Sequence, residues 1–257
     1  GSTLSSSFQS IKSQIQQTIF TISEEFNYHV LFAPLNPAAS DSITGYPVML
    51  SHPDSVPSIA SLNVVSSDSL NMFAQASGNN VEHGFQRAQN LINYNRSNGV
   101  FRNNANTIVV MISNGDDNES INNIGGNVVF DPDKFGTIKQ NFQKYTKLYN
   151  NTNSVSNPLD AESFRFMSLV AHSSCNFWQV GTTYRRMSNE LYDYQGFTDS
   201  SSKDSHDLCS KNYSGLFSSV NNSIRQILVG HKYDHWKISS QSASSIQEND
   251  ITLRKVF

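Results

Sequence analysis

The chain has 257 residues, of which 37% are hydrophobic and 15% charged, and its formal net charge at pH 7 is −3. This length suffices for a sizeable hydrophobic core in one large domain. Lysine and arginine are scattered along the chain, which argues against nucleic-acid binding, because that affinity comes mainly from neutralised phosphates. No apolar run approaches the roughly 20 residues of a membrane-spanning helix.

The N-terminal part of the chain predicts two helices and one strand. Apolar residues recur every three or four positions over residues 4–22, as in an amphipathic helix. Residues 28–36, YHVLFAPLN, predict a buried strand that ends at its prolines. Residues 37–68 are rich in Pro, Ser and Asp and predict a long loop with a short strand pair. A second helix is expected over residues 79–95.

The rest of the chain alternates strands and helices. This pattern predicts an α/β fold of three layers, with a mainly parallel central sheet and helices on both faces. We expect one domain over residues 1–257, with 231–257 as a C-terminal extension. The further elements are expected at 107–112 (strand), 131–150 (helix), 163–172 (strand), 182–196 and 213–229 (helices), and 235–239 and 251–257 (short strands).

The strand at 107–112 ends in a polar tip, which is the first candidate site. Its residues include Ser113, Asn114, Asp116 and Asp117. In parallel sheets, ligands bind beyond the carboxyl ends of the strands, so these side chains are candidate ligand-binding residues. Asp also favours turns and helix N-termini, so a purely structural role for the two carboxylates stays open.

The two cysteines, Cys175 and Cys209, both lie in polar, serine-rich segments. In a cytosolic protein they would remain free thiols, whereas in an exported protein they would form a disulfide. We favour the disulfide, which would close a loop of about 35 residues and contribute roughly 3–4 kcal/mol.

Catalytic chemistry has little support in the sequence. His206 and His235 each lie beside an aspartate, and serines are frequent throughout the chain. A hydrolase of the common α/β type would need a Gly-x-Ser-x-Gly turn to hold its nucleophile, and the sequence contains none. The histidines also lack the spacing of zinc ligands. We therefore expect a protein that is not an enzyme.

Four sequence motifs in order resemble the von Willebrand factor A domain, in the branch found in exported bacterial envelope proteins and lipoproteins. The resemblance covers about residues 4–228. The motifs are EHGFQRAQNLI (82–92), NRSNGVFRNNA (95–105), VVMISNGDDNES (109–120), and GTTYRRMSNELYDYQG (181–196) followed by DLCSKNYSGLFSSV (207–220). The resemblance implies a secreted or cell-envelope adhesion module that recognises a protein or glycan on a surface through loops at the strand ends.

Members of this family often hold Mg²⁺ or a similar cation at the strand ends, and this chain departs from their ligand pattern. The first strand of the family's sheet and its Asp are absent from the chain, leaving Ser2, or the following Thr3-Leu4, as the end of that loop. Asn79 or Asn80 stands where the family has a Thr, although both also suit a helix N-cap. Asn114 replaces the Asp of the strand tip, with Asp116 or Asp117 as substitutes.

Because a hard cation needs charged oxygen ligands, we expect no cofactor. The only metal candidate is Mg²⁺ or Ca²⁺ held weakly by Ser2, Asn114 and Asp116. The absent first strand also motivates a second hypothesis. The domain would then serve assembly, pairing with another chain or with the missing strand, and have no ligand site.

Overall fold

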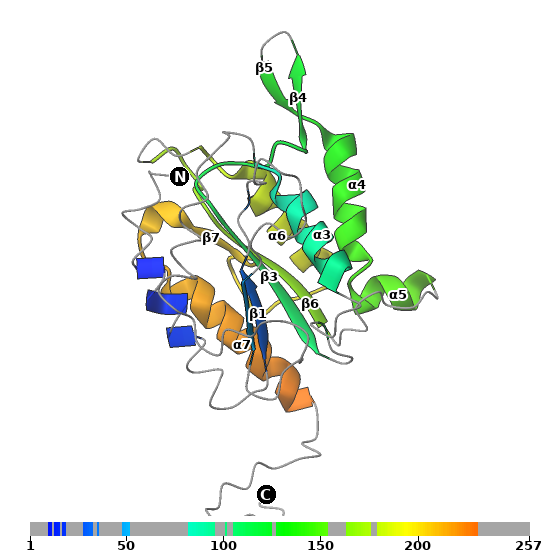
Figure 1. Cartoon of the computed structure of the whole chain (residues 1–257), viewed down its shortest axis with the longest axis vertical. Coiled ribbons are helices and arrows are strands. Elements are labelled where there is room, and N and C mark those ends of the chain that lie inside the picture. The colour runs from blue at the N-terminus through cyan, green and yellow to red at the C-terminus, as the bar shows by residue number, and fades with distance from the viewer. Residues whose placement is uncertain are drawn as a thin grey trace, which may run out of the picture.

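A computed structural model describes residues 10–11, 13–15, 17–18, 28–32, 35, 48–51, 82–95, 101, 105–124, 127–153, 163–175 and 179–230. Its centre is a parallel sheet in which β6 (Ser163–Val170) lies between β3 (Asn106–Ser113) and β7 (Ser205–Asp207) (Figure 1). β3 and β6 pair along their whole length, from Asn106 opposite Ser163 to Ser113 opposite Val170. The predicted parallel α/β sheet is confirmed at this level.

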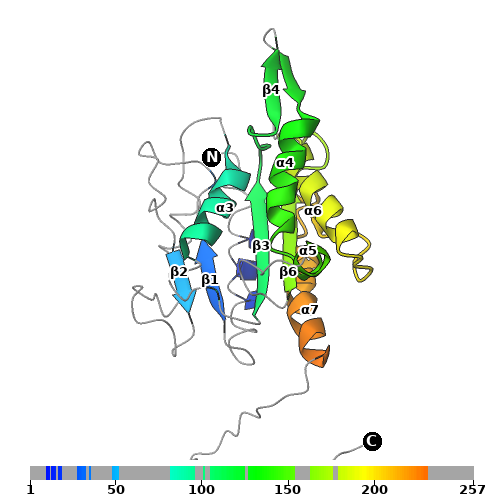
Figure 2. The same ribbon diagram turned by 90° about the vertical axis from the view of Figure 1, so that its right-hand side faces the viewer.

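Two antiparallel hairpins accompany the parallel sheet. β1 (His29–Phe32) pairs with β2 (Val48–Ser51), and β4 (Ile121–Ile124) pairs with β5 (Asn127–Phe130). The β4–β5 hairpin projects beyond the rest of the described molecule (Figures 1 and 2). The β1–β2 hairpin lies beside β3 and forms a two-stranded sheet of its own (Figure 2).

Helices cover both faces of the parallel sheet. They are α3 (Gly84–Asn95), α4 (Pro132–Gln143), α5 (Lys147–Asn153), α6 (Thr182–Tyr194), the short 3₁₀ helix η3 (Leu208–Ser210) and α7 (Ser214–Gly230). Residues 10–11, 13–15 and 17–18 are also helical, as predicted. Among the described residues, no helix combines the length and apolar character needed to cross a membrane.

The side chains of β6 alternate between two hydrophobic clusters, one on each face of the sheet. Phe164 and Phe166 join α3, α4 and α6 in one cluster, where Phe85 meets Phe142 edge-to-face at 6.0 Å. Met167 joins Ile11 and α7 in the other cluster. The core therefore lies on both faces of the sheet around β6. The loops follow the ends of the strands, outside these two clusters.

Several predicted boundaries differ from the structure. The single helix expected over 131–150 is wrong: it is broken between α4 and α5, because the Thr146 hydroxyl accepts a hydrogen bond from Tyr149 N and caps α5. β1 ends at Phe32, before the predicted 36, and β6 ends at Val170, before 172. The β4–β5 hairpin and β7 were not predicted. The strands expected at 235–239 and 251–257 lie outside the described residues.

Candidate binding rim

The loop that follows β3 folds back onto the segment before α3. The Ser113 hydroxyl donates to the Glu82 carboxylate at 2.6 Å, and Asn118 N donates to Glu82 O at 2.9 Å. A Cβ atom on Gly115 would lie 2.7 Å from Glu82 Oε1, so a larger residue there would displace the Glu82 carboxylate. The end of β3 and the start of α3 are thus held together.

The two carboxylates of the predicted tip cap helices that other parts of the chain supply. Asp116 accepts a hydrogen bond from Thr183 N at 2.9 Å and another from the Thr183 hydroxyl, in the first turn of α6. Asp117 accepts one from Phe85 N at 3.1 Å, in the first turn of α3. The first N–H groups of a helix lack partners within it and attract negative charge. One short loop therefore ties the starts of two helices to the end of β3.

A third carboxylate, Glu119, extends this capping cluster. It accepts a hydrogen bond from Gln86 N at 3.0 Å, and its Oε1 lies 3.3 Å from His83 Nδ1. Burial raises the pKa of Asp117 to about 6 and that of Glu119 to about 7, and neighbouring carboxylate charge adds to both shifts. Desolvation also raises the pKa of the remaining two carboxyls, Glu82 and Asp116.

The arrangement of these carboxylates decides how well they fit the cation that the sequence resemblance implies. Both oxygens of Asp116 accept from Thr183 N, at 2.9 and 3.2 Å. Within the part of the chain that the structure describes, no group of three or more His, Cys, Asp or Glu could hold a metal ion. Ser2, the third proposed ligand, lies outside that part. The carboxylate oxygens of Asp116 and Asp117 thus accept hydrogen bonds from helix N–H groups, whereas a hard cation needs about six oxygen ligands.

The loops after β6 and β7 are fastened to the same end of the sheet. Cys175 and Cys209 form the predicted disulfide, with their Cα atoms 6.0 Å apart. His172 N donates to Asp207 Oδ1 at 3.0 Å. We call the loops that follow β3, β6 and β7 the rim: residues 114–120, 171–175 with 179–181, and 208–213.

Asn114 is the predicted site residue that links two loops of the rim. Its backbone oxygen accepts a hydrogen bond from Gln179 N at 3.1 Å, and the residue is half-buried. Asn79 and Asn80 lie outside the described residues. The structure thus brings together Ser113, Asn114, Asp116 and Asp117, and adds Glu82, Glu119 and Thr183 as their hydrogen-bond partners.

A histidine–serine contact, which the sequence did not predict, lies below the rim. His172 Nε2 is 2.9 Å from Ser205 Oγ, but Ser205 is only 3% exposed. His206, the histidine singled out in the sequence, is partly buried, and desolvation lowers its pKa to about 4. His235 lies outside the described residues. The hydroxyl is enclosed by the fold, so this pair does not present an accessible nucleophile.

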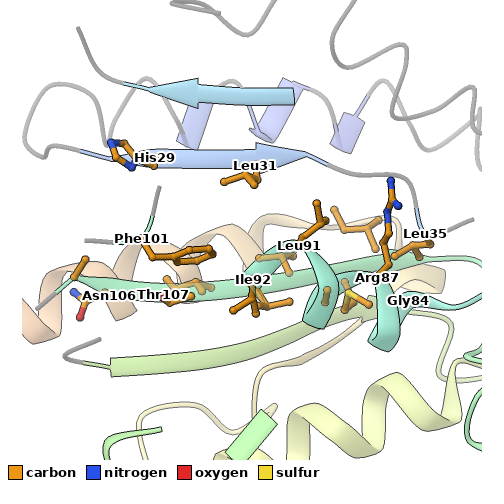
Figure 3. Close-up of a pocket in the computed structure, with 17 residues that line it drawn as sticks. His29, Leu31, Leu35, Gly84, Arg87, Leu91, Ile92, Phe101, Asn106 and Thr107 are labelled. Carbon is orange, nitrogen blue, oxygen red and sulfur yellow. The ribbon is translucent and has the colours of Figure 1, made fainter. Parts of the chain in front are cut away.

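A cavity of about 210 Å³ lies between β1 and β3 (Figure 3). One wall is the edge of β3 that faces away from β6, and α3 lies against the cavity. Its apolar lining includes Leu31, Leu35, Ala88, Leu91, Ile92 and Phe101.

Comparisons with known proteins identify no relative of this chain. No family model matches it. Searches of curated proteins and of solved structures also find no match.

Proposed function

We propose that this chain is a non-enzymatic binding module of the von Willebrand factor A type, which recognises a protein or glycan through the rim. The observation that carries this proposal is that three loops from separate parts of the chain are braced at one end of the parallel sheet. Asp116 and Asp117 hold the first loop to α6 and α3, and the Cys175–Cys209 disulfide joins the other two. Loops fixed before binding lose less conformational entropy on contact with a partner, which favours affinity.

The contact surface that we propose consists of the outward residues of the rim together with the neighbouring hairpin. Ser173 and Ser174 are exposed, and Asn114 is half-buried. Val129 on β5 is 44% exposed, one of two large hydrophobic residues exposed to this degree among those described. Neutral polar groups with an isolated apolar side chain suit a protein or glycan surface better than a highly charged partner.

The non-enzymatic and extracytoplasmic parts of the proposal rest on two further observations. Ser205, the serine that contacts a histidine in the described structure, is enclosed, so the geometry favours binding over hydrolysis. The disulfide favours a secreted or cell-envelope location, because such bonds persist in oxidising compartments.

The test measures binding of the purified protein to a printed glycan array and to a panel of immobilised extracellular proteins. Ser174→Arg and Val129→Arg place bulk and charge on the proposed surface, and we expect each to weaken the strongest interaction at least tenfold. Thr152→Arg, on an exposed position of α5, serves as the control and should bind as the wild type does. Equal binding by all four proteins would place the site away from the rim.

A further inference from the structure

The strand β7 is short and leads directly into the rim. It is the outer strand of the described parallel sheet, and its three residues pair with the last three of β6. The 3₁₀ helix η3 and the rim loop follow it without a break. A strand of this length is held by few backbone hydrogen bonds, so it can open locally at a small cost. Any such opening changes the support of the rim.

His206, the middle residue of β7, lies in surroundings that favour a neutral ring. It pairs with Leu169, which is fully buried in the cluster that includes α7. Its Nε2 atom is enclosed and has no hydrogen-bond partner among the described residues. Its Nδ1 atom lies against the first turn of α7, since a Cβ atom on Gly215 would be 3.4 Å from it. The N–H groups at the start of a helix carry partial positive charge, which disfavours a cation there.

The charged groups around His206 reinforce this preference. Burial and, after it, the charge of His172 lower the pKa of His206 to about 4. Burial and then Arg185 of α6 lower the pKa of His172 in turn, and Asp207 raises it. The Asp207 carboxylate is already engaged, because its Oδ1 accepts from His172 N and from Cys209 N, each at 3.0 Å. A protonated histidine donates from both ring nitrogens, so acid would place a donor at Nε2 that no described residue accepts.

β7 is anchored on both sides, which confines any opening to the strand itself. Asp204, the residue before β7, is 2% exposed and accepts a hydrogen bond from Arg165 Nε at 2.9 Å. Its backbone oxygen accepts another from Ser168 N at 2.9 Å. After β7, the disulfide joins Cys209 to Cys175. The segment between these anchors, residues 205–208, can therefore leave the sheet while the rest of the domain stays folded.

We propose that β7 is a pH-sensitive contact, which detaches from β6 when His206 becomes protonated and so loosens the rim in acid. In the open form the imidazolium reaches water. Asp207 is then withdrawn from His172 N and Cys209 N, so the loops after β6 and β7 lose a shared brace, while the disulfide keeps them attached. The change is therefore local and reversible, and it does not depend on what the rim binds.

The direction of the pH dependence follows from the two forms of β7. The pKa of His206 is about 4 in the closed form and about 6.5, its ordinary value, when the ring is exposed. The open form binds the proton more tightly, so opening is favoured as pH falls from about 6.5 to about 4. Between pH 7 and pH 5 the opening equilibrium should rise about twentyfold. Asp204, whose pKa burial raises to about 6, stays paired with Arg165 in both forms and does not contribute.

Hydrogen exchange of the full chain measures this opening. The exchange of residues 205–208 is compared at each pH between 7 and 5 with that of an unstructured peptide of the same sequence. We expect protection to fall at least tenfold over this range, whereas that of α4 should not fall. His206→Gln, which keeps a polar side chain but takes up no proton, should hold its protection within twofold. His83→Gln, the same substitution before α3, should behave as the wild type does.

A second measurement does not depend on whether the His206→Gln variant folds. In wild-type protein with labelled histidine rings, the NMR signal of His206 should titrate near pH 4, and residues 205–208 should lose protection as it does. If the ring takes up its proton near pH 6.5 while these residues remain protected, the closed form tolerates the charge and the proposal is overturned. Equal loss of protection in wild type and His206→Gln, or in 205–208 and α4 alike, would overturn it as well.

Discussion

β3 and β6 are neighbouring eight-residue strands of one parallel sheet, and they are buried to very different degrees. Seven of the eight residues of β6 are buried, including Arg165. In β3 only the last three, Met111, Ile112 and Ser113, are buried. From composition alone, β3 would be expected to be the more buried strand. It is continuously apolar over 108–112, whereas β6 contains an arginine and two serines. Burial therefore follows from the neighbours of a strand, and β3 has a cavity where β6 has a strand.

The two strands also differ in how they handle charge. Arg165 in β6 is 4% exposed and is paired with Asp199 and Asp204, at 2.7 and 2.9 Å. At the end of β3, Asp117 is fully buried and accepts hydrogen bonds from two backbone N–H groups and from the Tyr184 hydroxyl. The buried charge of β6, Arg165, is thus stabilised by opposite charges. The buried carboxylate at the end of β3, Asp117, is stabilised by neutral hydrogen-bond donors.

The largest predicted effect is the loss of the buried ion pairs of β6. Arg165→Met leaves the buried Asp204 and the partly buried Asp199 without their cation, so we expect a loss of about 3–5 kcal/mol in the free energy of unfolding by urea. Lys203→Met, which removes an exposed pair with Asp193, should cost less than about 1 kcal/mol. Similar losses for both variants would show that burial of Arg165 contributes little.

A somewhat smaller loss is expected from the disulfide, which fastens the end of β6 but not that of β3. Replacement of both Cys175 and Cys209 by Ser opens a loop with a sequence separation of 34 residues. On the chain-entropy estimate this lowers the free energy of unfolding by about 3–4 kcal/mol. Wild-type protein unfolded in the presence of a reducing agent should match the variant. An unchanged midpoint under both conditions would show that hydrogen bonds alone hold this part of the rim.

Local patterns in the sequence predicted two of the three strands of this sheet, β3 and β6, but neither β7 nor the contacts between the elements. The apolar run at 108–112, the helical periodicity of α6 and α7, and the disulfide all follow from residues close together or from their type. The β4–β5 hairpin was missed although Gly125-Gly126 between two short runs is a hairpin signal. In the capping cluster, Asp117 and Phe85 are 32 positions apart, and Asp116 and Thr183 are 67 apart. Such pairings depend on how the sheet brings loops together, which periodicity does not encode.

For Arg165, the sequence indicates that a partner exists but does not identify it. A single arginine inside the run SFRFMSLV implies a buried partner, since an unpaired buried charge is costly. The sequence does not say which of its aspartates supplies the partner. The answer, Asp199 and Asp204, depends on the loop after α6, where Asp204 has a positive φ of 61°.

The contrast in charge predicts a pH dependence at the end of β3. The pKa of Asp117 is raised to about 6 by burial, so the folded state binds its proton more tightly than the unfolded state. Stability therefore falls as pH rises from about 4 to about 6, by at most about 3 kcal/mol for a shift of about two pKa units. Asp117→Asn should remove this part of the slope, measured as urea unfolding between pH 4 and 7.5. A wild type and variant with parallel profiles would contradict the assignment.

The smallest predicted effect compares the same side chain on the two strands. Val170 in β6 is fully buried, whereas Val110 in β3 is half-buried and lines the cavity between β1 and β3. Val170→Ala should cost about 2–3 kcal/mol, because two methyl groups lose both burial and packing, and Val110→Ala should cost about 1 kcal/mol. Since the substitution is identical, the difference reports the surroundings alone. Equal costs in the isolated chain would mean that β3 is already covered on its free edge.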